Sequence, residues 1–186
     1  MFELPKTIVV FDTELTSWEG AMARNWSGPN EYKEIVQIGA VRIETETPEF
    51  RELDSFACYV KPVKNPILSK YFIDLTAITQ EKIEAEGKSL SEAVKTFFKW
   101  SDGNIIYSWG MDGDEIRDNC KLINIAFPFA DERFRDARDI FSNRGIKVSE
   151  YMSSTIIEGV GGEVTRLAHD GLNDARSIVD ALRLLH

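Results

Sequence analysis

Two acidic residues stand two positions apart near the start of the chain, in Asp12-Thr13-Glu14. They follow residues 7–11 (TIVVF), a short apolar and β-branched run that is typical of a strand buried on both faces. Alternate side chains of a strand point to the same face, so Asp12 and Glu14 should project together where this strand ends. Two carboxylates that close repel each other unless a cation lies between them. Taken alone, a solvated strand end is the better explanation of the pair, because a single Asp-x-Glu is common.

A third acid, Asp112, follows a predicted strand at residues 104–109 and begins a predicted helix at residues 112–123. Helical spacing places it on the apolar face of that helix, in line with Ile116, Cys120 and Ile123. A buried carboxylate is costly unless it is paired or bound to a metal. The alternative is an acid in the first helical turn that favours the helix dipole. Asp114 falls on the opposite side, three residues from Arg117, as expected for a solvated helix charge.

The fourth acid, Asp174, lies in the first turn of a predicted helix at residues 173–185 and faces its apolar side. The helix dipole is again the alternative explanation. His169 precedes Asp174 by five residues and is the only histidine besides His186. An imidazole suits proton transfer near neutral pH, although a lone histidine is more often a hydrogen-bonded structural residue. Its place beside an acid that needs a partner favours the chemical role.

The elements that must position these residues are predicted from their hydrophobic patterns. Three strands come first and strands then alternate with helices, which indicates a mixed α/β sandwich. The predicted strands are residues 7–11, 34–43, 56–60, 104–109 and 134–137. The predicted helices are residues 112–123, 138–143, 149–157 and 173–185, and another follows the capping box of Ser89 and Glu92, with Leu90, Ala93, Val94, Phe97 and Phe98 on one face.

In a twisted α/β sheet these acidic segments can converge on one crevice. Carboxylates suit Mg²⁺ or Mn²⁺ and not zinc, because no nearby cysteine or second histidine joins them. Two such ions about 3.5–4 Å apart activate a water and stabilise the leaving oxygen in phosphodiester cleavage. The sequence therefore predicts a two-metal site with His169 as the general base.

The composition limits the kinds of partner. The chain has 186 residues, 22 basic and 31 acidic, and a formal net charge of −9, which argues against holding long nucleic acid on a broad basic surface. Cys58 and Cys120 fit neither a disulfide framework nor a zinc site, and a reducing compartment suits them. No apolar stretch approaches the roughly 20 residues that cross a bilayer. We expect one domain spanning residues 1–186, a cytoplasmic location and no membrane association.

The order Asp12-x-Glu14, Asp112, His169-x4-Asp174 resembles the DEDDh family of 3′-5′ exonucleases, which includes ribonuclease T and the proofreading subunits of replicative polymerases. The resemblance runs from about residue 8 to residue 178. The connecting segments are similar to the branch of exoribonucleases that trims small RNAs and the ends of histone messenger or ribosomal RNA. Those segments are residues 34–41 (EIVQIGAV), 59–62 (YVKP), 75–80 (LTAITQ) and 108–110 (SWG).

The resemblance implies a ribonuclease H-like fold with a five-stranded mixed sheet flanked by helices, two Mg²⁺ or Mn²⁺ ions and nucleoside 5′-monophosphate products. It implies that single-stranded 3′ ends are the substrate, RNA in preference to DNA. By motif, His169 is the base, and the metals are held by Asp12, Glu14, Asp112 and Asp174. By the same motif, the residues beside the terminal nucleotide are Thr13, Leu15 and Thr16.

The chain departs from the family pattern at three points. Asn173 stands where a second acid is common, and Ala77 replaces a usual glycine. The middle motif is compact, so Asp114 is an alternative ligand to Asp112, although the helical-face argument favours Asp112.

Other interpretations stay open at this stage. One is an exonuclease-fold binding or regulatory module with little turnover, although no ligand or base is missing. Another is a hydrolase of small phosphodiesters or dinucleotides. Arg24, Trp18 and Trp26 in the predicted loop at residues 17–33 are candidates for stacking on substrate, or pack that loop on the body. Both a monomer and a homodimer are compatible with the sequence.

Overall fold

The computed structural model describes residues 4–185, and its centre is a mixed sheet of five strands. The strands are β1 (Thr7–Leu15), β2 (Ile35–Glu44), β3 (Glu52–Tyr59), β4 (Ile105–Ser108) and β5 (Phe134–Asp136). Their spatial order is β3-β2-β1-β4-β5; β1, β2 and β3 pair antiparallel, whereas β4 is parallel to both β1 and β5. The five-stranded mixed sheet predicted from the sequence is confirmed.

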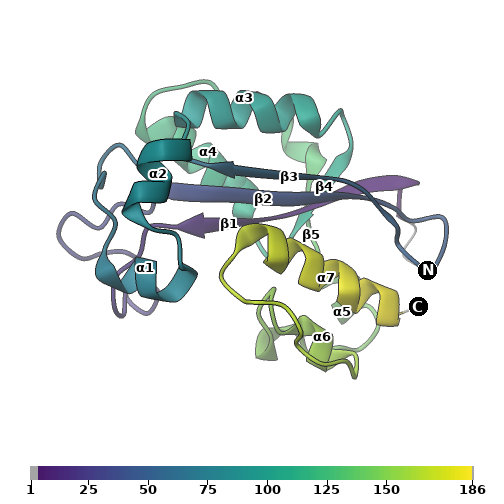
Figure 1. The fold of residues 1–186 in the computed structure, drawn as a ribbon. Helices are drawn as coiled ribbons and strands as arrows, with labels where there is room; N and C mark the ends of the chain where they lie inside the picture. The colour runs from purple at the N-terminus through teal and green to yellow at the C-terminus, as the bar shows by residue number, and fades with distance from the viewer. Residues whose placement is uncertain (1–3, 186) are drawn as a thin grey trace.

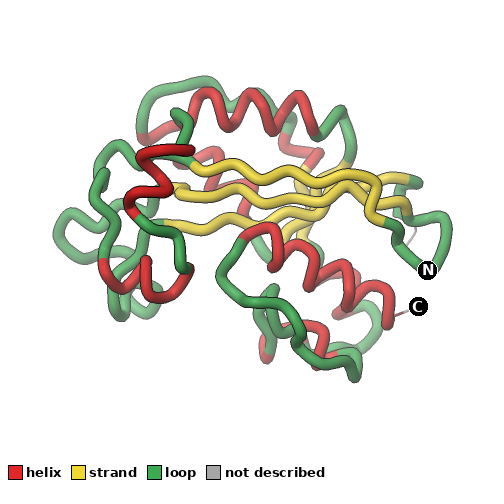
Figure 2. Tube along the Cα trace, viewed as in Figure 1, coloured by secondary structure: helices red, strands yellow, loops and turns green. Residues whose placement is uncertain are grey.

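Helices cover both faces of this sheet (Figure 1). On one face lie α3 (Leu90–Trp100) and α4 (Asp112–Leu122), and on the other α5 (Arg138–Ser142), α6 (Ile156–Gly159) and α7 (Gly171–Leu185). Two short helices stand beside one end of the sheet, α1 (Lys70–Thr76) and α2 (Gln80–Glu86). The tube in Figure 2 shows long loops joining these elements around that same end. Within residues 4–185, no helix has the length and apolar character needed to span a bilayer.

Strand β1 is buried on both faces, as its sequence predicts. Ile8 and Val10 belong to the hydrophobic cluster shared with α7, whereas Val9 and Phe11 belong to the cluster shared with α3 and α4. All four side chains are fully buried. A central strand packed this tightly is a rigid support for any side chain that follows on the same strand.

Three sequence predictions need correction. Strand β1 runs to Leu15 and pairs with β2 throughout, so Asp12 and Glu14 lie inside it and not beyond its end. Phe98 is exposed and packs edge-on against Phe129 instead of joining the buried face of α3.

The predicted helix at residues 149–157 is absent, and a 3₁₀ turn (Val148–Glu150) and the short α6 stand in its place. Hydroxyl side chains interrupt it: Thr155 Oγ1 accepts the backbone N–H of Met152, and such bonds compete with helix formation. Helices α1 and α2 were not predicted.

Candidate active site

A cavity of about 370 Å³ opens at the end of the sheet where β1 finishes. A volume of this size is within the range of small-ligand sites. It is lined by the four acids that the sequence predicts as metal ligands and by the histidine: Asp12, Glu14, Asp112, Asp174 and His169. Residues from β1, from the start of α4 and from the start of α7 thus meet in one place, although up to 162 positions separate them.

Asp12 and Glu14 reach the cavity from β1 and are each only 8% exposed. Burial is the main reason that the pKa of Glu14 is raised to about 8, and the charges of Asp174 and Asp170 add to it. The pKa of Asp12 is raised well above its usual range, first by burial and then by the carboxylates around it. A hydrogen bond with Ser153 opposes that rise. A nearby cation would therefore stabilise the ionised forms of both carboxyl groups strongly.

The start of α7 is held directly against β2. A Cβ on Gly39 would lie 2.0 Å from the backbone nitrogen of Leu172, so only glycine permits this approach. Two residues away, the Gln37 amide accepts the N–H of Gly171 at 2.8 Å and donates to Asp170 Oδ2 at 3.0 Å. The segment QIGA of β2 thus fixes where α7 begins.

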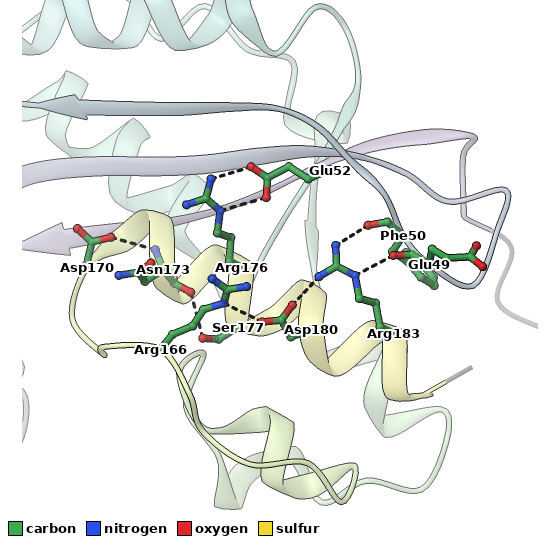
Figure 3. A network of polar contacts seen from close by, with 10 residues as sticks. All are labelled: Glu49, Phe50, Glu52, Arg166, Asp170, Asn173, Arg176, Ser177, Asp180 and Arg183. Atoms are coloured by element: carbon green, nitrogen blue, oxygen red, sulfur yellow. Dashed lines mark hydrogen bonds and ion pairs between the residues drawn. The ribbon is translucent and has the colours of Figure 1, made fainter.

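Arginine side chains fix the rest of α7 along the sheet (Figure 3). Arg176 forms a bidentate pair with Glu52 of β3, at 2.7 and 3.0 Å. Arg183 donates to the backbone carbonyls of Glu49 and Phe50, and Arg166 pairs with Asp180 from the preceding loop. These contacts prevent α7 from sliding or rotating, and Asp174 in its first turn is placed accordingly.

Asp174 and His169 are tied to each other through the backbone. His169 adopts a left-handed conformation (φ 62°), one that histidine tolerates better than most residues, and its N–H donates to Asp174 Oδ2 at 3.2 Å. The other oxygen, Oδ1, is buried and has no hydrogen-bond partner among the described residues. Burial raises the pKa of Asp174 to about 7.

One ligand atom from each of Glu14, His169 and Asp174 lies within 4.8 Å of the other two. A buried carboxylate oxygen without a partner, surrounded by other carboxylates, is the environment that a divalent cation would satisfy. The donors are almost all oxygens, and none of the described residues that line the cavity is a cysteine, which suits Mg²⁺ or Mn²⁺ better than zinc. The residues therefore fit a divalent metal.

Asp112 reaches the cavity from the opposite side of β1. Its Oδ1 accepts a hydrogen bond of 2.6 Å from Thr13 Oγ1, which lies between the two acids of β1. Burial raises its pKa to about 6, and the Thr13 bond and the charge of Lys33 limit the rise. Asp114 is half-exposed, pairs with Arg117 and does not line the cavity. Position therefore favours Asp112 over Asp114.

The turn before Asp112 has its own support. Asp136 at the end of β5 accepts the N–H of Gly110 at 3.1 Å, and Arg138 holds the same carboxylate through two guanidinium nitrogens. The Trp109 indole donates to the carbonyl of Tyr151 at 3.1 Å. Both contacts fix the peptide that leads from β4 into α4.

Of the three residues placed beside a terminal nucleotide by the family motif, Thr13 and Leu15 line the cavity and Thr16 does not. The Thr16 hydroxyl donates to the carbonyl of Tyr32 and accepts the N–H of Glu34, so it anchors the following loop. The hydroxyl of Thr13 is committed to Asp112.

The loop between β1 and β2 contributes both of its tryptophans, Trp18 and Trp26, to the cavity wall. The third stacking candidate, Arg24, instead pairs with Glu31 inside the loop.

Sequence reasoning missed several residues of the wall. Ser153 approaches Asp12, and Lys33 pairs with Glu115 beside Asp112. Ser153 falls in a segment predicted as a helix, and Lys33 ends a segment taken for a loop, so neither carried a signal in the sequence.

Comparison with known proteins places the chain in a family. A family model described as Exonuclease (RNase_T) matches residues 9–182. The chain belongs to this exonuclease family. Among its relatives, human ERI1 exoribonuclease 2 is 26% identical over 196 residues, covering 91% of this chain and 27% of the relative. Rat 3′-5′ exoribonuclease 1 is 26% identical and is matched over 96% of this chain and 52% of its own length. This exonuclease-family chain thus spans about half, or less, of these relatives.

A solved structure confirms the fold. The nuclease domain of 3′hExo, a DEDDh family member crystallised with bound rAMP, superposes with a TM-score of 0.80 at 24% identity. The match covers 97% of this chain and 92% of that one. The ribonuclease H-like fold implied by the sequence resemblance is therefore correct for this exonuclease-family chain.

Proposed function

We propose that the chain, as one exonuclease domain over residues 1–186, is a metal-dependent 3′-5′ exoribonuclease that releases nucleoside 5′-monophosphates. The observation that carries the proposal is the convergence of four carboxylates and one histidine on a single cavity, where burial and neighbouring charges raise the pKa values of the carboxyl groups. Family membership agrees with it, as do the activities named for the relatives and the nucleotide bound in the similar structure.

In this proposal Asp12, Glu14, Asp112 and Asp174 hold two Mg²⁺ or Mn²⁺ ions. Such ions, when bound, lower the pKa of a water and stabilise charge on the scissile phosphate and the leaving oxygen. The chain positions its own groups for this chemistry: β1 supplies two carboxylates from a rigid strand, and Thr13 orients Asp112.

His169 takes the proton of the attacking water. One of its ring nitrogens lies near Glu14 and Asp174, and its backbone N–H donates to Asp174, which supports this role. Histidine is the side chain best suited to accept a proton near neutral pH.

The test uses 5′-labelled single-stranded RNA and DNA of equal length, incubated with Mg²⁺, Mn²⁺ or a chelator. Wild type should give a metal-dependent ladder that shortens from the 3′ end, faster on RNA. His169→Ala should abolish the ladder, and Glu163→Gln, an exposed change six residues earlier, should not. Absence of a ladder on either strand would favour a binding module or a small-phosphodiester hydrolase.

We also propose that the protein acts in the cytoplasm. Cys58 and Cys120 are buried free thiols, and burial raises the pKa of Cys120 to about 11, so neither is disposed to form a disulfide. Fluorescence microscopy of the tagged protein tests the location.

Sedimentation of the purified chain tells a monomer from a homodimer.

A further inference from the structure

Three exposed methionines line the cavity. Met22, Met111 and Met152 all line it and are 69%, 60% and 53% exposed. Apart from Met1, which lies outside the described residues, the chain has no other methionine. They come from three separate segments: the loop after β1, the residue before α4 and the turn before α6. Exposed apolar side chains gathered at one place, and not scattered, indicate a binding surface.

Helix α1 extends the same surface. Tyr71 and Leu75 line the cavity and are 41% and 38% exposed. We call these five side chains the apolar rim: Met22, Tyr71, Leu75, Met111 and Met152.

The cavity lacks free positive charge. Five acids line it, and Lys33 is the only lysine or arginine among the described lining residues. Lys33 is already paired with Glu115, and its ammonium lies 4.5 Å from the centre of the Trp26 ring. Nearby cations are paired as well, Lys70 with Asp74 and Arg138 with Asp136. A nucleic acid at this cavity therefore meets few partners for its phosphates.

We propose that the apolar rim binds the unpaired bases at the 3′ end of a short single strand and supplies most of the affinity for substrate. This inference rests on the proposed function and adds to it the length of the substrate and the source of its binding energy. Methionine side chains are flexible and polarisable, so they can contact any base without reading its identity. Few phosphates are neutralised, so affinity should depend weakly on salt and should not grow with strand length beyond the rim.

The first measurement is kcat/KM on 5′-labelled RNAs of five and thirty nucleotides between 50 and 300 mM KCl. The logarithm of kcat/KM should fall with that of salt with a slope of about −1 or shallower, because single strands give about −0.7 per phosphate contact. The two lengths should differ by less than about threefold in kcat/KM. A slope steeper than about −3, or a large preference for the longer strand, would overturn the inference.

The second measurement compares variants. The triple variant Met22→Gln, Met111→Gln and Met152→Gln keeps side-chain length and removes the apolar surface. We expect its KM to rise about tenfold and its kcat to fall by less than about threefold. The corresponding leucine triple variant keeps the apolar surface, and its KM should rise by no more than about threefold.

Leu53→Gln is the matched control. Leu53 is an exposed apolar residue of β3, at the end of the sheet opposite the cavity, and its change should leave KM unaltered. Fluorescence anisotropy of the five-nucleotide RNA in chelator gives a readout independent of turnover, and the glutamine triple should bind about tenfold more weakly. If the glutamine triple variant and wild type have equal KM values and bind the RNA equally well, the proposed role of the apolar rim is wrong. No 3′ shortening by wild type contradicts the proposed function itself.

Discussion

The two sides of β1 present their carboxylates in different ways. On the α4 side, Asp112 receives a 2.6 Å hydrogen bond from Thr13, and its pKa is about 6. On the α7 side, Asp174 leaves one buried oxygen without a partner among the described residues, Glu14 lies close by, and their pKa values are about 7 and 8. The protein itself thus provides a hydrogen bond to the carboxylate on the α4 side, whereas the carboxylates on the α7 side depend on a cation for compensation of their charge.

The carboxylates on the two sides of β1 should therefore respond differently to metal binding in the proposed mechanism. A carboxylate that the protein already orients binds a cation with little rearrangement. A buried carboxylate with no partner gains the most from a cation and destabilises the fold most without one.

Loss of Asp174 should have the largest effect. We expect Asp174→Asn to lower metal-dependent kcat/KM at least about 10³-fold, more than the 10–100-fold typical of losing an indirect metal contact. In chelator at pH 8.5, where both groups are ionised in wild type, the same variant should melt at a higher temperature than wild type, because a buried charge repelled by Glu14 has gone. Steady-state kinetics and thermal melts measure both effects. Unfolding of the variant would instead assign Asp174 a structural role.

The stability of the metal-free protein should depend on pH in the direction set by the raised pKa values. The folded state holds protons on these carboxyls more tightly than the unfolded state, so stability is greatest below about pH 4 for these groups and is lost as pH rises through 6, 7 and 8. Tm in chelator should therefore fall between pH 5 and 8.5, by about 2–4 °C for each kcal/mol of stability that is lost.

Metal should oppose this loss. Millimolar Mg²⁺ or Mn²⁺ should raise Tm more at pH 8 than at pH 5, because deprotonated carboxylates bind the ion. The shift should be smaller in Asp174→Asn. A Tm in chelator that is flat or rises across this range would contradict the assigned pKa directions.

Removing the bond on the α4 side should have an intermediate effect. Thr13→Val deletes the donor to Asp112 while keeping side-chain shape, and we expect kcat/KM to fall about tenfold, as for a lost hydrogen bond to a charged group. The acid limb of the pH–rate profile should move to higher pH, because that bond lowers the pKa of Asp112. Thr13→Ser keeps the donor and should restore both the rate and the profile; an unshifted profile in the valine variant would mean that Thr13 does not act through Asp112.

The smallest effect on activity is expected at Asp114, which lies two residues after Asp112 in α4. Asp114→Asn breaks a partly buried pair with Arg117, outside the cavity, that is worth about 1 kcal/mol, and kcat/KM should change by less than about twofold. Asp112→Asn, assayed in parallel, should be nearly inactive. The reverse result would make Asp114 the ligand of the middle motif.

The sequence predicted the elements whose patterns are long or strongly apolar. The TIVVF run of β1 and the apolar faces of α4 and α7 were identifiable, and they carry the acids that converge in the structure. Helices α1 and α2 were not, because each has seven residues and one or two buried side chains, and so short a segment shows little periodicity. Only their capping residues, Ser69 and Thr79, offered a local signal.

Other features depend on tertiary structure. Lys33 and Ser153 reach the cavity through contacts with distant segments, which no local pattern encodes. The family resemblance predicts a glycine at the position of Ala77, and the backbone conformation there explains why glycine is favoured. Ala77 ends α1 in the left-handed conformation (φ 58°), at a cost of roughly 1–2 kcal/mol for a residue with a side chain.

The contact of α7 with Gly39 also determines when the site is completed during synthesis of the chain. Asp174 enters the cavity only when Gly171 and Leu172 lie against β2, and β2 is made more than 130 residues earlier. A chain still on the ribosome, synthesised only through α6, therefore has three of the four carboxylates and neither His169 nor Asp174. We expect such a nascent chain to be inert toward the messenger that encodes it, so that the proposed exonuclease activity arises only after α7 has emerged and docked.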